Sequence, residues 1–415
     1  MLVMAGALAR KNRNGLGLTR GKYQDVSTFV VAALVRAFRS QSPRALLFAL
    51  SVTAFACSTL QGAGAEVKIG AVTCLTGALS TFGVSSVQGL HLAVDQMNAS
   101  GGVLNEPIDL VVEDNGSKAG ESATIVRKFI SRDKVAAILG DLTSSATMEA
   151  APLAQAAKIP MLTPSATNIA ITKIGDYIFR SCFIDPFTGR IMAKFALDEL
   201  HAKRAIVMTD VKQDYSVGLT DAIRQYFAGN GSGTLSEISY SSGDTNFRPQ
   251  LIEVRMARPD VVFLPGYYTE AALILRQARQ LGINCPFVGG EGWDSPALIQ
   301  VAGKGADGNY YANHFSAADP DPKVQKFVYE YRARYGSAPD ALAACWYDGA
   351  RLLAQAVQRA GSTDSAKLRD ALATTRDFDG VTGRISIDQN RNAAKPGVIL
   401  RIDNGAPETM KRIIP

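Results

Sequence analysis

Short apolar runs alternate with helical patterns from residue 66 onward. The run "EVKIGAV" (66–72) precedes a segment in which Leu90, Val94 and Met97 recur at helical spacing. Further Val- and Ile-rich runs follow in the same alternation, at 108–114, 135–140 and 159–165. The order βαβαβαβ predicts a parallel sheet with helices on both faces.

A second series of the same kind begins near residue 186, and each of its strand-like runs precedes a helical pattern. These runs are 204–210, 233–241, 260–266 and 285–292. After two long helical segments, the run "GRISIDQN…GVILRIDNG" alternates like an antiparallel hairpin. Because 415 residues are too many for one small core, we predict an α/β protein with two Rossmann-like lobes whose sheets are mainly parallel.

Small hydroxyl side chains follow two strands of the first series. Thr143, Ser144 and Ser145 come after the run 135–140, and Ser165 and Thr167 come after "IPML". Ligands of open α/β sheets bind beyond the carboxyl ends of the strands. A turn from strand to helix also presents N–H and O–H groups at the positive end of the helix, which suits an anion.

Acidic and phenolic side chains hold the equivalent places in the second series, at Tyr215, Tyr267 and Glu291. A carboxylate with phenol hydroxyls can hold an ammonium group through charge-assisted hydrogen bonds. An anion site on one lobe and a cation site on the other predict a receptor for a zwitterion. Taken singly, each residue also fits a plainer interpretation, with Ser and Thr as helix N-caps and Glu291 as a solvated loop acid.

The first 65 residues have the pattern of a secretory leader. Arg44 precedes an apolar stretch from Ala45 to Cys57, and small residues end the segment at Ala65. This order matches the charged region, apolar region and cleavage site of a signal peptide, and the stretch is too short to span a bilayer comfortably. A buried hydrophobic helix is one alternative, and a lipidated N-terminus at Cys57 is another.

The net charge of +6 belongs to this leader, which holds eight Lys or Arg and one acid. The remaining chain has 36 basic and 37 acidic residues, so nucleic-acid binding loses its main argument from the sequence. Four cysteines follow the leader, far apart and without a C-x-x-C motif, so zinc and thioredoxin-type chemistry are not expected. Export permits disulfides between them, and free buried thiols fit equally well.

Enzyme motifs are missing from the sequence. There is no G-x-S-x-G, H-E-x-x-H or Walker A pattern. Gly303, Gly305 and Gly308 form G-x-G-x-x-G, but a helical pattern precedes them and a strand-like run follows. A dinucleotide site needs the reverse order, so we interpret these glycines as a helix C-cap and a turn.

From residue 66 to the end, the chain resembles the periplasmic binding proteins of branched-chain amino-acid ABC transporters. The resemblance rests on "GDLTSSAT", "IPMLTPSATN", "YIFRSCFIDPFTG", "DVVFLPGYYTEAALILRQAR" and "VGGEGWDS", in this order and spacing. It implies a type I fold, in which a three-strand hinge joins the two lobes. It also implies that 66–184 plus 314–384 form the first lobe and that 185–313 plus 385–415 form the second.

The resemblance also implies roles for the polar candidates. Ser144 contacts the ligand carboxylate, and Ser165 and Thr167 complete that side. Glu291 receives the ammonium group, with Tyr267 beside it. These roles agree with the zwitterion site expected from the residues themselves.

The walls of the pocket are implied in the same way. Tyr215 and Tyr347 enclose it, and Phe82 stands where the family often has a tyrosine, so it adds apolar surface and loses a hydroxyl. Trp293, next to Glu291, is expected to change the pocket's size.

The implied function is capture of an amino acid, branched-chain or otherwise apolar, outside the cytoplasm and its delivery to an ABC permease. The resemblance implies no enzyme activity, cofactor, metal or nucleic-acid partner. Two alternatives stay open. One is a sensing module for a separate membrane receptor, and the other is a receptor for amides, urea or aromatic acids.

Overall fold

The computed structural model describes residues 67–230 and 233–414. The leader expected at 1–65, with its alternative anchor at Cys57, lies outside these residues. Within the described part, every helix is too short or too polar to cross a bilayer. All four cysteines of this part are free thiols. Of the two interpretations, disulfides or free thiols, the structure therefore agrees with the second.

The first sheet has five parallel strands in the order β2-β1-β3-β4-β5. They are β1 (Val67–Thr73), β2 (Ile108–Asp114), β3 (Ala137–Leu139), β4 (Met161–Thr163) and β5 (Ile178–Arg180). The β-branched runs expected from the sequence form these strands, and β3, β4 and β5 are buried along their whole length. Burial on both faces is what a parallel sheet between two helical layers requires.

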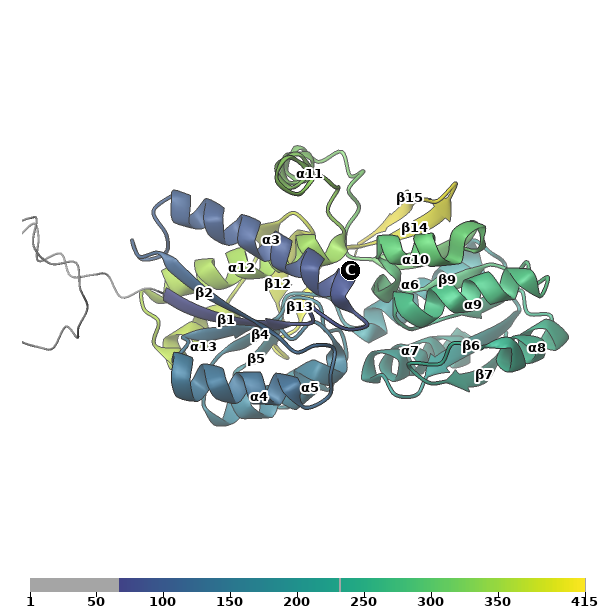
Figure 1. The fold of residues 1–415 in the computed structure, drawn as a ribbon, viewed down its shortest axis with the longest axis horizontal. Coiled ribbons are helices and arrows are strands. Elements are labelled where there is room, and N and C mark those ends of the chain that lie inside the picture. Colours follow the sequence, from purple (N-terminus) through teal and green to yellow (C-terminus); the bar gives the residue numbers. More distant parts are fainter. Residues whose placement is uncertain (1–66, 231–232, 415) are drawn as a thin grey trace, which may run out of the picture. The chain divides into compact units, whose positions relative to one another are not determined.

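Helices cover both faces of this sheet, with α3 and α12 on one side and α4 and α5 on the other (Figure 1). Their bounds are α3 (Ser80–Ala99), α4 (Glu121–Lys128), α5 (Ser144–Ala156) and α12 (Ala341–Ala360). The axes of α3 and α12 approach closely at Gly89, where a Cβ atom would lie 2.0 Å from the carbonyl oxygen of Ala343. α11 (Pro322–Tyr335) and α13 (Ser365–Ala373) complete this lobe.

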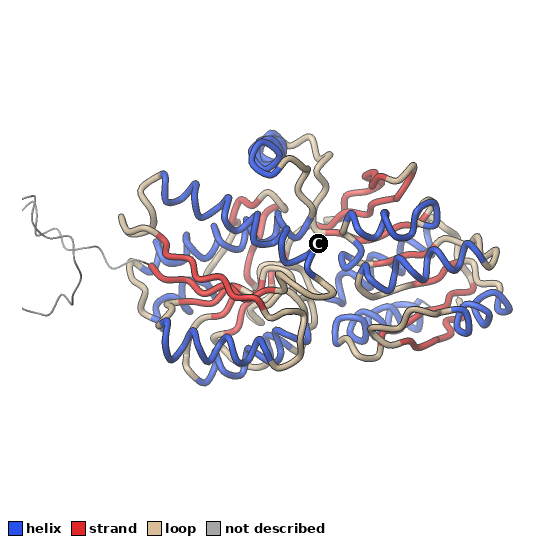
Figure 2. Tube along the Cα trace, viewed as in Figure 1, coloured by secondary structure: helices blue, strands red, loops and turns tan. Residues whose placement is uncertain are grey.

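The second sheet has seven strands in the order β15-β14-β10-β9-β8-β6-β7. They are β6 (Arg204–Asp210), β7 (Thr234–Tyr240), β8 (Val261–Phe263), β9 (Phe287–Gly289), β10 (Asn309–Asn313), β14 (Gly397–Asp403) and β15 (Ala406–Ile413). The strands β6 to β10 run parallel, and β14 and β15 add an antiparallel edge. The predicted α/β class with two mainly parallel sheets is confirmed, and Figure 2 shows the strands of both sheets lying among helices.

Five helices flank this second sheet. They are α6 (Asp185–Asp198), α7 (Asp214–Asn230), α8 (Arg248–Ala257), α9 (Tyr268–Gln280) and α10 (Pro296–Ala302). α6 packs against α7, and α9 packs against α8 and α10. Gly303 is the C-cap of α10 and begins a 3₁₀ turn ahead of β10, so the cap-and-turn interpretation of the glycine motif is confirmed.

The C-terminal hairpin differs from the prediction. β12 (Gly383–Ile387) pairs with β11 (Phe378–Gly380) and β13 (Ala393–Ala394), whereas β14 pairs with β10 and β15. Residues 383–394 also attach to the first lobe, where Arg180 N donates to Arg391 O (3.2 Å) and Thr172 Oγ1 to Asn392 Oδ1 (3.0 Å). The expected second-lobe segment 385–415 is therefore wrong at its start, because these hydrogen bonds hold the chain to the first lobe until β14 begins.

Candidate functional site

The N-terminus of α5 faces the second lobe and presents the hydroxyl group of Ser144. Thr143 caps the helix, because its Oγ1 accepts a hydrogen bond from Ala146 N (3.4 Å). Ser144 is therefore spared from capping, and its Oγ accepts a hydrogen bond from Asn168 N (3.2 Å). A buried hydroxyl in the first turn of a helix lies in the positive end of the helix dipole, so this position suits an anion.

The loop after β4 brings Ser165 and Thr167 to the same place. Ser165 Oγ donates to Leu142 O (3.0 Å) and accepts from Trp346 Nε1 (3.2 Å). Beneath the loop, the fully buried guanidinium of Arg180 donates from Nη1 to Ala166 O (3.0 Å) and from Nη2 to Asn168 O (2.6 Å). Arg180 thus ties down two carbonyl groups of this loop and holds the loop in place. Arg180 was not among the predicted site residues, because an arginine inside the strand-like "YIFR" has no motif of its own.

The second lobe contributes two stacked tyrosines. The rings of Tyr215 and Tyr267 lie 5.2 Å apart at an angle of 18°. Tyr215 sits in the first turn of α7, and Tyr267 is the N-cap residue of α9. Gly292 N donates to Tyr215 OH (3.4 Å), and a Cβ atom on Gly292 would come within 2.5 Å of Gly266 O. Glycine at this position therefore lets the backbone after β9 pack directly against the tyrosines.

Glu291 lies in the 3₁₀ turn η3 (Glu291–Trp293) and joins the two lobes. Thr167 Oγ1 donates to Glu291 Oε1 (3.3 Å), while Glu291 Oε2 is buried without a hydrogen-bond partner among the described residues. Burial, followed by the charge of Asp185, raises the pKa of Glu291 from 4.5 to about 8. A buried carboxylate oxygen without a donor favours the approach of a cation.

Asp185 is a second buried carboxyl beside Glu291. It begins α6, and neither of its oxygens has a hydrogen-bond partner within 67–230 and 233–414. Burial raises its pKa from 3.8 to about 7. Asp185 was not among the predicted site residues, because an aspartate before Pro186 also fits the ordinary start of a helix. The two acids together make this end of the cleft strongly receptive to positive charge.

These groups converge on one cavity between the lobes. Its lining includes seven predicted residues: Phe82, Ser144, Ser165, Thr167, Tyr215, Tyr267 and Glu291. It also includes Leu142 and Leu342, which were not predicted because single leucines carry no chemical signal. The cavity is narrow, with about 20 Å³ open to the centre of a water molecule.

The narrow cavity reflects a closed arrangement of the lobes. Thr81 Oγ1 in α3 donates to Tyr268 OH in α9 (2.5 Å). On the other rim, Asn168 Nδ2 donates to Asp214 O (2.7 Å) and Asp214 N donates to Ser145 Oγ (3.2 Å). Contacts on both rims close the cleft, so a solute of amino-acid size enters only when the lobes part.

Two predicted site residues lie elsewhere. Tyr347 OH donates to Gln96 Oε1 (2.8 Å), and its ring packs on Phe327, which places it between α12, α3 and α11. Trp293 Nε1 donates to Leu264 O (3.1 Å), and its ring lies against Gly289. Neither side chain lines the cleft cavity. The expectation that Tyr347 walls the pocket is therefore wrong in this structure. Trp293 lies behind Glu291, outside the lining of the cleft cavity.

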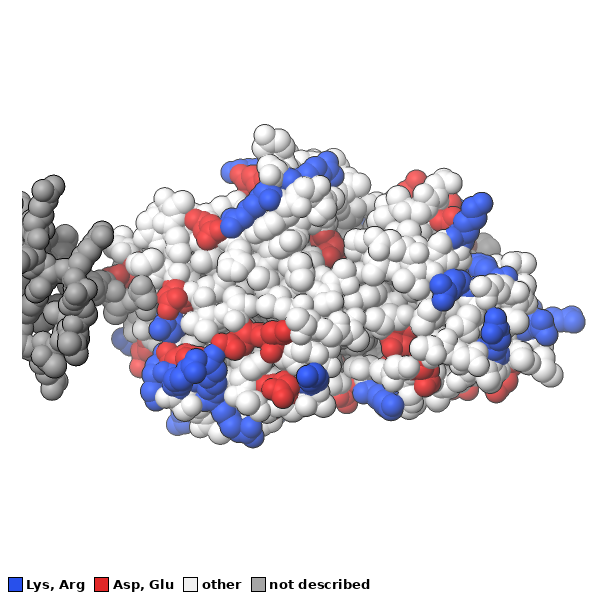
Figure 3. All heavy atoms as spheres, in the orientation of Figure 1, with Lys and Arg blue, Asp and Glu red and all other residues white. Residues whose placement is uncertain are grey.

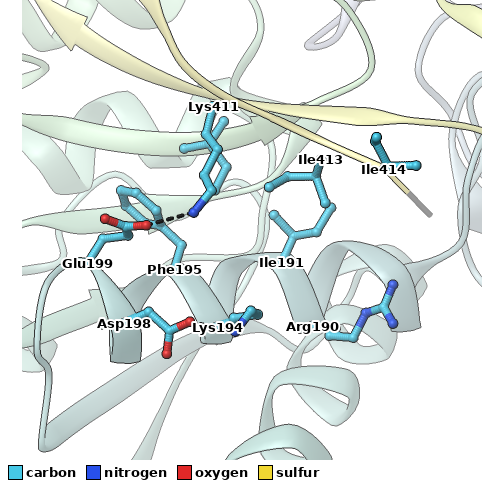
Figure 4. A pocket seen from close by; sticks show the side chains of 10 residues that line it. Arg190, Ile191, Lys194, Phe195, Asp198, Glu199, Lys411, Ile413 and Ile414 are labelled. Carbon is cyan, nitrogen blue, oxygen red and sulfur yellow. Dashed lines mark hydrogen bonds and ion pairs between the residues drawn. The ribbon is translucent and has the colours of Figure 1, made fainter.

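A second hollow lies between α6 and β15 (Figure 4). Its volume by the same measure is about 270 Å³, and Ile191, Phe195 and Ile413 form much of its apolar lining. The charges at its rim pair with one another, because Lys411 contacts Glu199 (2.7 Å) and Lys194 contacts Asp198 (2.5 Å). It is larger than the cleft cavity, but it lacks the buried, unpaired polar atoms that mark the cleft as the candidate site.

Neither a metal site nor a strongly charged surface competes with the cleft as the candidate site in the described part of the chain. The described residues contain no group of three His, Cys, Asp or Glu side chains placed to hold a metal ion. On the face shown in Figure 3, basic and acidic side chains are interspersed over both lobes. The cleft thus remains the place where charge, hydroxyl groups and apolar surface meet.

The two buried acids predict a pH-dependent opening of the ligand-free protein. Above its ordinary pKa of 4.5, Glu291 stays protonated in the closed form until about pH 8, so the closed form binds more protons than an open, solvated one. Closure therefore weakens as the pH rises through this window, and Asp185 acts in the same direction up to about pH 7. The radius of gyration from small-angle X-ray scattering should increase between about pH 5 and 8. A smaller increase is expected for Glu291→Gln, and identical profiles for both proteins would contradict this role.

Comparisons with known proteins place the chain among solute receptors. A family model described as "Periplasmic binding protein" matches residues 66–407. A solved leucine-binding protein of Thermotoga maritima is 39% identical, with a TM-score of 0.81 over 84% of this chain and 99% of its own. The branched-chain amino acid transporter substrate-binding protein LivJ of Streptococcus pneumoniae, solved with isoleucine, is 34% identical, with a TM-score of 0.79 over 85% and 100%. A leucine-, isoleucine-, valine-, threonine- and alanine-binding protein of Pseudomonas aeruginosa is 26% identical over 83% of this chain and 91% of the relative.

Proposed function

Since the chain belongs to the periplasmic binding protein family, we propose that it captures an amino acid with an apolar side chain between its two lobes and delivers it to an ABC permease. One observation carries this proposal: the buried carboxylate of Glu291 faces the hydroxyl groups at the N-terminus of α5 across a single cavity. The positive group of a zwitterion would meet the carboxylate there, and its negative group would meet the hydroxyl groups.

The carboxylate of the ligand binds on the first lobe. Ser144 offers its hydroxyl in the first turn of α5, where the helix dipole favours negative charge. Thr167 adds a hydroxyl group from the loop that Arg180 holds in place, and Ser165, whose hydroxyl proton is donated to Leu142 O, lines the same side of the cavity. This half of the site is rigid because it is built on strand ends and a buried arginine.

The ammonium group binds on the second lobe. Glu291 Oε2 supplies an acceptor without a competing donor, and Asp185 adds negative charge behind it. Their pKa values, raised by burial, fall when a cation arrives, so binding fixes the ionised form of Glu291. Tyr215 and Tyr267 enclose the ammonium group from the side.

The side chain of the ligand meets apolar surface. Phe82, Leu142 and Leu342 line the cavity, and the ring of Phe82 packs edge-on against Tyr267 with centroids 6.1 Å apart. Phenylalanine at this position presents no hydroxyl, so a polar ligand side chain would lose its hydrogen bonds to water there. This lining favours leucine, isoleucine and valine, which are among the ligands that the names of three relatives state.

Binding proceeds by closure of the lobes. The open form takes the carboxylate on the first lobe, and rotation of the second lobe then brings Glu291 onto the ammonium group. The ligand stabilises the closed form because only that form makes both sets of contacts. A permease that recognises the closed lobes receives the solute. Export through the leader at 1–65, with Cys57 as an alternative lipid anchor, places the protein where such solutes arrive.

A thermal-shift screen tests the proposal. Leucine at 100 times its dissociation constant is expected to add about 2.7 kcal/mol to the stability of the protein. Urea and benzoate should give no shift, because urea lacks both charges and benzoate lacks the ammonium group that Glu291 and Asp185 require. A shift with benzoate but not with leucine would replace the amino-acid receptor with a receptor for aromatic acids.

A further inference from the structure

Tyr268 reaches across the rim of the cleft and docks on the first lobe. It is the first residue of α9 in the second lobe, and it is 6% exposed. Its hydroxyl group donates to Ala78 O (2.8 Å) and accepts from Thr81 Oγ1 (2.5 Å), so one side chain makes two hydrogen bonds to the other lobe. Both bonds break when the lobes part, although Tyr268 itself lies outside the lining of the cleft cavity.

The part of the first lobe that receives this tyrosine is held by its own backbone. It comprises residues 74–82, the turn after β1 and the start of α3, and we call it the rim segment. Asp114 Oδ1, at the end of β2, accepts from Leu75 N (2.8 Å). A Cβ atom on Gly83 would lie 2.0 Å from Cys74 O, so the first turn of α3 packs directly on the backbone that leaves β1. The rim segment therefore offers the hydroxyl group a firm docking place.

Phe82 connects this docking contact to the cleft. Its ring is 2% exposed and lines the cavity in which the ligand's side chain is proposed to lie. The same ring stands edge-to-face against Tyr268, with centroids 4.7 Å apart at 72°, and against Tyr267 at 6.1 Å and 80°. Aromatic pairs favour this geometry, and protein interiors are packed too closely for one ring to shift alone. A ligand that pushes Phe82 out of place therefore also pushes on Tyr268.

We propose that Tyr268 is a positioning residue that limits the size of the ligand's side chain. The inference rests on the proposed function, since it takes the ligand to be an amino acid whose side chain meets Phe82. A side chain of the size of leucine leaves Phe82 against Tyr268, and both hydrogen bonds to the rim segment form as the lobes close. The larger side chain of phenylalanine displaces Phe82 toward Tyr268, and the lobes close without these two bonds.

Selectivity follows because a ligand favours closure only as far as it binds the closed form better than the open one. Leucine gains the cleft contacts together with the two hydrogen bonds of Tyr268, whereas phenylalanine gains the cleft contacts alone. The hydroxyl group of Tyr268 therefore adds to the affinity for leucine and adds little to the affinity for phenylalanine, although it touches neither ligand.

Titration calorimetry of Tyr268→Phe with both amino acids tests the proposal, with phenylalanine measured in competition with leucine. The substitution keeps the ring that packs on Phe82 and removes the hydroxyl group alone. The affinity for leucine is expected to fall about tenfold, since two neutral hydrogen bonds are lost, and the affinity for phenylalanine should change less than about twofold. The preference for leucine therefore falls about fivefold or more. A merely structural role for Tyr268 would lower both affinities equally and leave the preference unchanged.

Tyr329→Phe is the matched control. Tyr329 is 75% exposed in α11, so loss of its hydroxyl group should leave both affinities at their wild-type values. Equal losses for leucine and phenylalanine in Tyr268→Phe, or no loss for either, would overturn the inference and leave the amino-acid receptor in place. Binding of neither amino acid to the wild-type protein would instead remove the proposed function, and the size limit with it.

A second variant tests the size limit from the other direction. Tyr268→Ala removes the ring against which Phe82 packs, so Phe82 can give way to a larger ligand. We expect the preference for leucine over phenylalanine to fall by about a further fivefold below that of Tyr268→Phe. A preference equal to that of the wild-type protein would show that Tyr268 does not set the limit, and Tyr268→Phe decides the question if the alanine variant folds poorly.

Discussion

Replacing Glu291 with alanine is expected to weaken leucine binding by at least about a hundredfold. In the closed protein this carboxylate is 6% exposed, and it is the acceptor for the ammonium group in the proposed complex. Without it, the ammonium group is left buried beside the tyrosines with Asp185 as the remaining acid, at a cost of roughly 3 kcal/mol or more. Titration calorimetry of the folded variant gives the affinity directly.

The control for this substitution is Glu253→Ala. Glu253 is exposed in α8 and does not line the cleft cavity, so its removal should leave the affinity for leucine unchanged. The stability of the ligand-free Glu291→Ala protein should not fall, because the substitution removes a buried, incompletely paired carboxyl group. An affinity for leucine equal to that of wild type would show that Glu291 does not hold the ligand.

Gly89→Ala is expected to destabilise the protein by about 2–3 kcal/mol. The added Cβ atom would lie 2.0 Å from Ala343 O and 2.7 Å from its carbonyl carbon, so the backbone of α12 must shift. Leu342, which lines the cleft cavity, precedes Ala343 and would move with it. We therefore expect both a lower melting temperature and weaker leucine binding, measured by thermal unfolding and by calorimetry.

Gly229→Ala is the matched control, since it makes the same change in the helix α7. An added Cβ atom would have no neighbour within 4 Å among the residues that the structure describes, so the higher helix propensity of alanine should add about 0.5–1 kcal/mol of stability. If Gly89→Ala melted at the wild-type temperature, the close approach of α3 and α12 would not be a constraint on the fold.

Much of the fold follows from local sequence signals. The β-branched runs at 66–72 and 204–210 became β1 and β6 almost residue for residue, because burial between helices demands continuous apolar strands. The polar residues of the cleft were found for a related reason. Ser144, Thr167 and Glu291 each follow a strand of a parallel sheet, and such strand ends meet at one edge.

Other features depend on contacts that no local pattern contains. Tyr347 looks like a pocket residue by motif, but its place in α12 turns it toward Gln96 in α3. Asp185 gains its importance from burial beside Glu291, a distant residue in the chain. Likewise, Arg391 and Asn392 belong with the first lobe through hydrogen bonds to Arg180 and Thr172. Each case is decided by tertiary packing rather than by propensity.

A crystal structure of the protein with leucine tests the central claim most directly. We expect the leucine carboxylate within hydrogen-bonding distance of Ser144 Oγ and Thr167, its ammonium group on Glu291, and its side chain against Phe82 and Leu342. Leucine bound in the reverse orientation, or outside the cavity between the lobes, would contradict it.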